Sequence, residues 1–151
     1  FAGLALYRER FAYGSATTED LQAVMEEVSG RDLEAFFQQW IYGEYFPRYN
    51  YSYLLTPQDG QTLVQLRIEQ MQSNAGVFVM PIRMRLWTDG GYEWVTVEND
   101  RRIQNYSFTV TGTASFMELD PQKWILRQVL GGGQTAVTPA ATASCTAASP
   151  L

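Results

Sequence analysis

The spacing of apolar residues changes from helical to extended near Pro47. Between Gly30 and Pro47, apolar side chains recur at intervals of three and four residues, which places them on one face of a helix. They are Leu33, Phe36, Phe37, Trp40 and Ile41. Gly43 and Pro47 follow, as is typical of a helix end. The pattern predicts a helix over residues 32–42, after which the chain turns toward a sheet.

Two more helices are predicted before this one. Residues 1–13 have helical spacing and are followed by Gly14. Thr17 and Asp20 fit a capping box, in which two side chains satisfy free backbone amides at a helix start. The next helix, over Thr18–Ser29, has an apolar face made of Leu21, Val24, Met25 and Val28. Three short helices of this kind are typical of the end of a helical bundle.

From residue 49 onward, polar and apolar residues alternate with the period of strands. The predicted strands cover residues 49–54, 63–68, 77–87, 92–97, 103–110, 116–120 and 124–130. Pro81 indicates an edge strand or a bulge, and Thr88-Asp-Gly-Gly91 indicates a hairpin. Strands at this spacing predict an antiparallel β-sandwich of about seven strands.

The fold class is therefore α+β, a short N-terminal helical segment followed by a β-sandwich, and the chain divides into three regions. Residues 1–46 form the helical region and residues 47–130 form the sandwich. Residues 131–151 are rich in Gly, Ala, Thr and Ser, which predicts a low-complexity tail. The glycine run 131–133 lacks a following Lys and helix, so we interpret it as a linker and not as a phosphate-binding loop.

Composition narrows the function classes. The chain has 151 residues, 46% of them hydrophobic, so a substantial core is expected. Its net charge is −5 and its basic residues are scattered, which argues against a nucleic-acid partner. There is no apolar run long enough to span a membrane. The sequence has no initiator Met and no signal peptide, and we expect it to be a segment of a longer protein.

Several ordered motifs resemble one family. The first are Tyr13-Gly-Ser-Ala-Thr-Thr-Glu-Asp-Leu21, Val28-Ser-Gly-Arg-Asp-Leu33, Phe36-Phe37 and Trp40-Ile-Tyr42. The later ones are Ile68-Glu-Gln-Met-Gln72, Pro81-Ile-Arg-Met-Arg85 and Leu119-Asp-Pro-Gln-Lys-Trp-Ile-Leu126. Together they resemble the C-terminal part of aminopeptidase N-like zinc metallopeptidases, peptidase family M-one. The resemblance covers residues 7–129 and implies that residues 1–46 end a helical catalytic domain.

The resemblance also implies a zinc site that this chain does not hold. In the family, zinc is bound by a His-Glu-x-x-His helix and a further Glu, all upstream of the matched region. This chain has no histidine, so we expect no catalytic, cofactor-binding or metal-binding residue in it, and zinc only in the parent enzyme. The expected function is a non-catalytic fragment that supports the catalytic domain, with the rest of the parent polypeptide as its partner.

Some residues allow a functional interpretation as well as a structural one, and we favour the structural interpretation in each case. Trp40 could line a cleft, but helical spacing explains it as core. A sugar platform could include Tyr49, Tyr51, Tyr53, Trp87 and Trp94. Packed sandwich faces explain these aromatics better.

A functional interpretation is also possible for two carboxylate pairs, the cysteine and two asparagines. The pairs that could act in acid–base chemistry or bind a cation are Glu118 with Asp120 and Glu98 with Asp100. Solvated surface explains both pairs. Cys145 lies in the predicted tail without a base to activate it. Asn50-Tyr-Ser52 and Asn105-Tyr-Ser107 fit the glycosylation pattern, which matters only in a eukaryotic secretory setting.

Two alternatives to the family-based function stay open. A sandwich with exposed aromatic residues is also typical of a module that binds a glycan or a protein partner. The helices, taken without a surrounding bundle, would expose apolar stripes and could drive self-association.

Overall fold

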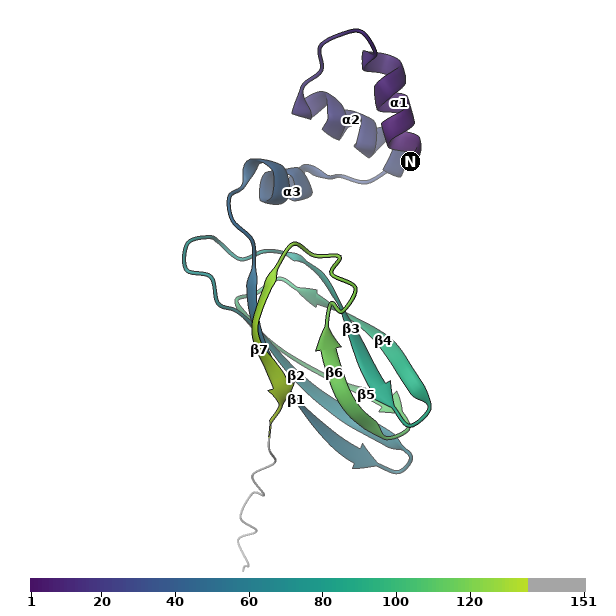
Figure 1. The fold of residues 1–151 in the computed structure, drawn as a ribbon, viewed down its shortest axis with the longest axis vertical. Helices are drawn as coiled ribbons and strands as arrows, with labels where there is room; N and C mark the ends of the chain where they lie inside the picture. The colour runs from purple at the N-terminus through teal and green to yellow at the C-terminus, as the bar shows by residue number, and fades with distance from the viewer. Residues whose placement is uncertain (136–151) are drawn as a thin grey trace, which may run out of the picture. The chain divides into compact units, whose positions relative to one another are not determined.

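The computed structural model describes residues 1–135 of the 151-residue chain. Within this range, three short α-helices and a π-helical turn precede seven strands arranged in two sheets (Figure 1). This arrangement confirms the predicted α+β class, a helical segment followed by a β-sandwich. The chain divides into two compact units: Phe1–Phe46 with Ser73–Gly76, and Pro47–Gln72 with Val77 onward.

The helical unit begins with α1 (Ala2–Phe11) and α2 (Thr18–Ser29). The predicted capping box is present at the start of α2. The Asp20 amide donates to the Thr17 hydroxyl over 3.3 Å, and the Thr17 amide donates to the Asp20 carboxylate over 2.9 Å. Gly30 ends the helix with a left-handed φ of 66°, a conformation that glycine adopts without steric cost.

The two helices approach each other closely at Gly3. This glycine is buried, and a Cβ atom placed on it would lie 2.5 Å from the Met25 sulfur. At the other end of α1, Arg10 donates two hydrogen bonds to Glu27 of α2, over 2.7 and 2.8 Å. Both side chains are about half exposed, so water screens this ion pair and its contribution to stability is small.

The helix predicted over residues 32–42 is shorter and less regular in the structure. α3 covers Glu34–Phe37, and the chain continues as the π-helical turn η1 (Gln38–Tyr42). Gly43 then has a φ of −73°, and a Cβ atom there would lie 2.6 Å from the Gln39 carbonyl oxygen. The glycine is thus required by a close backbone approach rather than by a left-handed cap.

The apolar stripe predicted along this helix is only partly buried. Phe37 is 4% exposed, whereas Phe36 and Ile41 are each 52% exposed. Trp40 is partly exposed. No helix among residues 1–135 has the length and apolar character that crossing a bilayer demands.

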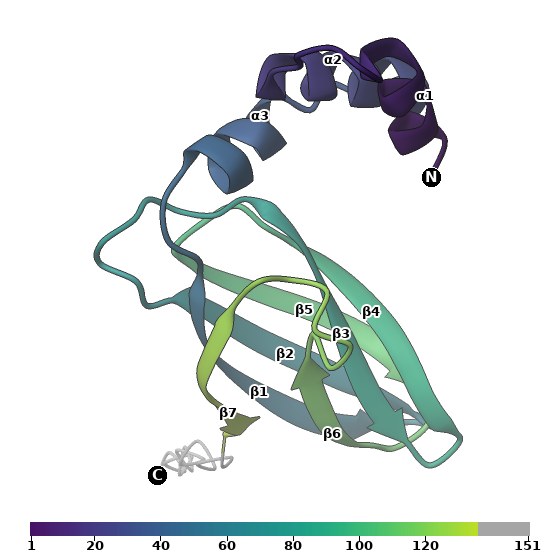
Figure 2. The ribbon, with the colours of Figure 1, turned by 45° about the horizontal axis from the view of Figure 1, so that its top comes forward.

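The second unit is a sandwich of two sheets, visible as two layers in Figures 1 and 2. Its strands are β1 (Arg48–Gln58), β2 (Gln61–Gln70), β3 (Met80–Thr88), β4 (Gly91–Asn99), β5 (Ile103–Thr111), β6 (Ala114–Leu119) and β7 (Gln128–Gln134). One sheet has the order β5-β2-β1-β7 and the other has the order β4-β3-β6. Neighbouring strands are antiparallel except β1 and β7, which are parallel.

The last strand differs from the prediction in position and in pairing. β7 covers Gln128–Gln134 rather than residues 124–130, and residues 124–126 lie in the loop before it. The glycines 131–133, predicted to be a linker, belong to this strand. The Tyr51 ring lies over Gly132 and leaves no room for a Cβ atom, so glycine at this position permits close packing. The predicted tail beyond residue 135, including Cys145, lies outside the described residues.

The core of the sandwich lies between the two sheets, because alternate residues of each strand point inward. Its most deeply buried apolar side chains are Tyr49, Val64, Leu66, Ile68, Ile82, Met84, Leu86 and Met117. They come from both sheets, so the unit closes its own core. The Tyr51 hydroxyl also joins the layers by donating to the Met117 carbonyl of β6 over 3.2 Å.

Candidate functional site

The outer face of the β4-β3-β6 sheet gathers arginine and aromatic side chains. Alternation along β3 turns Arg83, Arg85 and Trp87 away from the core, while the residues between them are buried. Strand register brings further side chains beside them: Trp94 opposite Arg85, Tyr92 opposite Trp87, and Glu118 on the other side of Arg85. We call Arg83, Arg85, Trp87, Tyr92, Trp94 and Glu118 the arginine–aromatic face.

The two arginines of this face stack on its aromatic rings. The Arg83 guanidinium lies 4.1 Å from the centre of the Trp94 ring, and the Arg85 guanidinium lies 5.0 Å from that of Trp87. Tyr92 packs edge-on against both tryptophans. Such contacts hold the planar groups in place. Trp87 is still 37% exposed and Tyr92 53% exposed, so the face is accessible to a ligand.

Glu118 neutralises only one of the two arginines. Its carboxylate accepts from Arg85 Nε over 2.8 Å and from the Trp87 indole over 3.1 Å. Partial burial raises the pKa of Glu118, but the bonds from Trp87 and Arg85 outweigh it, so the pKa lies below its ordinary value. The carboxylate is therefore ionised at neutral pH and committed to Arg85.

A small pocket opens beside Arg83, at the edge of this face. Its volume is about 260 Å³, and its lining residues are Pro81, Arg83, Thr96, Asp120, Trp124 and Ile125. We call it the Arg83 pocket. β3 and β4 supply its floor, and the loop from Asp120 to Ile125 supplies one wall. Trp124 is 79% exposed on that wall.

Asp120 organises the loop that forms this wall. It is 1% exposed, and its carboxylate accepts from the Trp124 amide over 2.9 Å, the Ile125 amide over 3.2 Å and Arg127 Nε over 3.2 Å. Its backbone amide donates to the Arg83 carbonyl over 2.8 Å. All of these partners belong to the fold, so Asp120 fixes the wall rather than offering its charge to a ligand.

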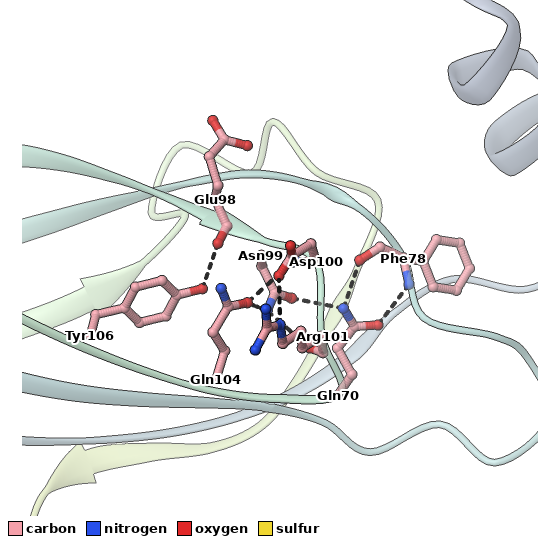
Figure 3. Close-up of polar contacts among 8 residues, drawn as sticks. All are labelled: Gln70, Phe78, Glu98, Asn99, Asp100, Arg101, Gln104 and Tyr106. Carbon is pink, nitrogen blue, oxygen red and sulfur yellow. Dashed lines mark hydrogen bonds and ion pairs between the residues drawn. The ribbon is translucent and has the colours of Figure 1, made fainter.

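A second polar cluster lies inside the sandwich, near the ends of β2, β4 and β5 (Figure 3). The Gln70 side chain bonds both backbone groups of Phe78, accepting from its amide over 2.9 Å and donating to its carbonyl over 2.7 Å. It also donates to Asn99 over 2.7 Å and accepts from Gln72 over 2.8 Å. Every bonding position of this amide is thus used, which identifies the cluster as a structural anchor for the chain before β3.

The structure separates the residues of the predicted sugar platform. Tyr49 and Tyr53 are buried in the core, and Tyr51 is partly buried between the layers. Trp87 and Trp94 lie instead on the outer face of the other sheet. The tyrosines therefore form no common platform with the tryptophans. Burial raises the pKa of Tyr49, whose hydroxyl has no hydrogen-bond partner among the described residues.

The two carboxylates of each predicted pair also have different surroundings in the structure. Glu118 is bonded to Arg85, while Asp120 points into the loop that it organises. Asp100 lies 3.6 Å from Arg101 in an exposed ion pair, and the Glu98 side chain points away from the cluster in Figure 3. Asn50 and Asn105 are exposed on β1 and β5.

The donor groups of residues 1–135 do not fit a catalytic zinc site. The sequence contains no histidine, and residues 1–135 contain no group of three His, Cys, Asp or Glu side chains that could hold a metal ion. Zinc sites in proteins use three or four such ligands around one point.

The fold resembles part of a solved aminopeptidase. The crystal structure of Legionella pneumophila aminopeptidase A in complex with aspartic acid superposes with a TM-score of 0.57 at 17% identity, covering 84% of this chain and 15% of that chain. At this identity the likeness concerns the fold alone.

Sequence comparison points to the same class of protein. Aminopeptidase M1-A of Oryza sativa subsp. japonica is 34% identical over 87 residues, 54% of this chain and 9% of that protein. Aminopeptidase N of Lactococcus lactis subsp. cremoris (strain MG1363) is 45% identical over 40 residues, 26% of this chain and 5% of that protein. No protein-family model matches the sequence. The chain spans less than a tenth of the length of these relatives. Together, the comparisons confirm the predicted resemblance to the C-terminal part of an aminopeptidase N-like protein.

Sequence reasoning missed the Arg83 pocket and the Gln70 cluster as sites. Gln70 and Gln72 have the same parity as Val64, Leu66 and Ile68 on the inward side of the strand. This parity is a signal that could have placed the two glutamines in the core. The pocket gave no such signal, because its walls come from three separate parts of the chain.

Proposed function

We propose that this chain is a non-catalytic segment of a zinc aminopeptidase-type metallopeptidase. The observation that carries the proposal is its similarity to short parts of two aminopeptidases from a plant and a bacterium. By analogy with those relatives, the parent would remove residues from the amino terminus of peptides. The zinc and its ligands would come from other parts of the parent polypeptide.

The proposed role of this segment is architectural. The helical unit would complete a larger helical domain, since several of its large apolar side chains are exposed: Phe1, Leu4, Val28, Phe36 and Ile41. The sandwich would brace that domain from outside, because its own core is already closed. Rigid bracing positions a catalytic domain without contributing any reacting group.

Two measurements test this proposal. The purified chain should show no zinc-dependent hydrolysis of an amino-acid anilide, whereas the whole parent should be active and should lose activity with a chelator. The reading frame around residue 1 should encode a His-Glu-x-x-His motif upstream. Hydrolysis by the purified chain, or a reading frame without a metallopeptidase domain, contradicts the proposal.

A second candidate function rests on the arginine–aromatic face. Exposed Trp87 and Tyr92 beside stacked arginines are also typical of a surface that binds a glycan or a protein. Titration against a glycan panel, with Trp87→Ala as the matched variant, separates the two functions. Binding that Trp87→Ala abolishes would favour the binding module.

Self-association is the third candidate, carried by the same exposed apolar side chains of the helical unit. Surfaces of this kind commonly drive dimers. Light scattering of the chain over a hundredfold concentration range tests it, with Phe36→Ser and Ile41→Ser as variants that should reduce any association.

A further inference from the structure

The Arg83 pocket has the features of a docking point for a protein side chain. We infer that it receives a carboxylate-bearing segment of the parent polypeptide that lies outside this chain. This inference rests on the proposed function and adds to it the surface and the chemistry of the contact. It does not involve the arginine–aromatic face beyond Arg83 and its stacking partner.

The size of the pocket suits one side chain rather than a cofactor. Its volume is about 260 Å³, below the roughly 300–1,000 Å³ typical of small-molecule sites. Pro81, Trp124 and Ile125 make most of its lining apolar. An aliphatic or aromatic side chain of a neighbouring segment would fill it and remove Trp124, now 79% exposed, from water.

The charge beside the pocket is positive and uncompensated. Among residues 1–135, neither Arg83 nor Lys123 forms an ion pair with a carboxylate. Asp120 lines the pocket, but its carboxylate is buried and bonded to its own loop and to Arg127. In a chain with a net charge of −5, Arg83 in the pocket and Lys123 in the loop that forms its wall both lack a carboxylate partner, which favours an acidic occupant.

Contacts within the sandwich already fix the position of the Arg83 guanidinium. Trp94 supports one face of its guanidinium at 4.1 Å, and Gln122 accepts from Arg83 Nη1 over 3.3 Å. The same Gln122 oxygen accepts from the Trp124 indole over 3.1 Å, so the cation and the pocket wall are positioned together. A planar guanidinium with free donors binds a carboxylate through two parallel hydrogen bonds, at a lower entropy cost when it is already fixed.

The remainder of the parent is the occupant that these observations favour. This chain spans less than a tenth of its curated relatives, so in such a parent most of the polypeptide would be available to cover the pocket. The expected contact is an Asp or Glu side chain on Arg83 and Lys123, with an adjacent apolar residue in the pocket.

The test supplies the chain in trans to the parent polypeptide from which this segment has been deleted. Isothermal titration calorimetry measures the affinity of the complex. Arg83→Glu should weaken binding at least tenfold, and Trp124→Ala should weaken it several-fold. Arg101→Glu makes the same charge change at an exposed arginine that is paired with Asp100, and it should change the affinity by less than twofold. Two controls show whether a variant is misfolded. One is Arg83→Gln, which keeps a hydrogen-bonding group, and the other is a thermal transition that should stay unchanged.

The outcomes separate the inference from the proposed function. Equal binding by Arg83→Glu and Arg101→Glu, or no binding of the wild-type chain, overturns the inference and leaves the proposed function standing. A reading frame without a metallopeptidase domain overturns both. If the chain alone dimerises and Arg83→Glu abolishes that dimer, the occupant is a second copy and the inference is wrong.

Discussion

The two units of this chain differ in how much of their own apolar surface they bury. The sandwich encloses a core to which both sheets contribute, with Leu66, Ile82 and Met84 at most 1% exposed. In the helices only Gly3, Val24 and Phe37 are buried. Seven paired strands can close a core, whereas three short helices cannot cover their own apolar stripes. One unit therefore closes its own core, whereas the other leaves much of its apolar surface exposed.

Hydrogen exchange should reveal this difference most strongly. Amides in the central strands β1, β2 and β3 should open only with global unfolding, because tertiary packing covers them. Amides in α1 and α2 should open at free energies about 5 kcal/mol lower, since helices this short are marginal without packing. Native-state exchange measured by mass spectrometry checks this. Equal protection in both units would show that their opening free energies do not differ.

Two leucine substitutions test the same difference in buried apolar surface between the units. Leu66→Ala should cost about 3–5 kcal/mol of unfolding free energy, because it removes a side chain that is 1% exposed and leaves a cavity. Leu4→Ala, at a position 56% exposed, should change stability by less than about 0.5 kcal/mol. Urea unfolding followed by tryptophan fluorescence measures both. Similar costs at the two positions would mean that the helical unit has a core of its own.

Within the sandwich, Asp120 and Asp100 allow a buried ion pair to be compared with an exposed one. Asp120→Asn should cost about 3 kcal/mol, since it leaves Arg127, 15% exposed, without its charged partner. Asp100→Asn should cost less than about 0.5 kcal/mol, because its pair with Arg101 is exposed. Chemical denaturation of the two variants provides the test, and a small effect at Asp120 would show that the loop holds without its carboxylate.

The capping box offers a smaller test inside the helical unit. Thr17→Ala removes the acceptor for the Asp20 amide and should destabilise α2 by about 1 kcal/mol. Ser15→Ala, in the exposed turn before it, is the control and should have little effect. Exchange rates of the α2 amides report the change. If the strands respond as strongly as α2, the two units unfold together.

The smallest expected effect is on pH dependence. The pKa of Glu118 is lowered on folding, so its contribution is present above the ordinary value of 4.5 and is lost as pH falls through the lowered value. Glu118→Gln should therefore remove about 0.5–1 kcal/mol at pH 7 and make the loss of stability below pH 5 shallower. Unfolding of this variant and of Glu93→Gln, an exposed β4 residue, from pH 3 to 7 measures the difference. Identical slopes in both variants would contradict it.

Local patterns predicted the elements but not their partners. Thr17 and Asp20 form the predicted capping box, and the strand alternation between residues 49 and 120 matches the structure closely, because both signals arise from neighbours in sequence. The prediction failed at residues 124–134. There the glycines belong to a parallel strand beside β1, and the Tyr51 ring that requires a glycine at position 132 is distant in sequence. At η1 the chain stays helical, but as a π-helical turn that the spacing did not predict.

The sequence determined the α+β class, the capping box that begins α2 and the inward parity of most strands, since these depend on periodicity and on residues a few positions apart. Only the three-dimensional structure shows which tyrosines are buried, which arginine of the arginine–aromatic face lacks a carboxylate, and how the loop from Asp120 to Ile125 forms a pocket with β3 and β4. These features need contacts between segments separated by tens of residues, and such contacts are set by sheet order and register rather than by any local pattern.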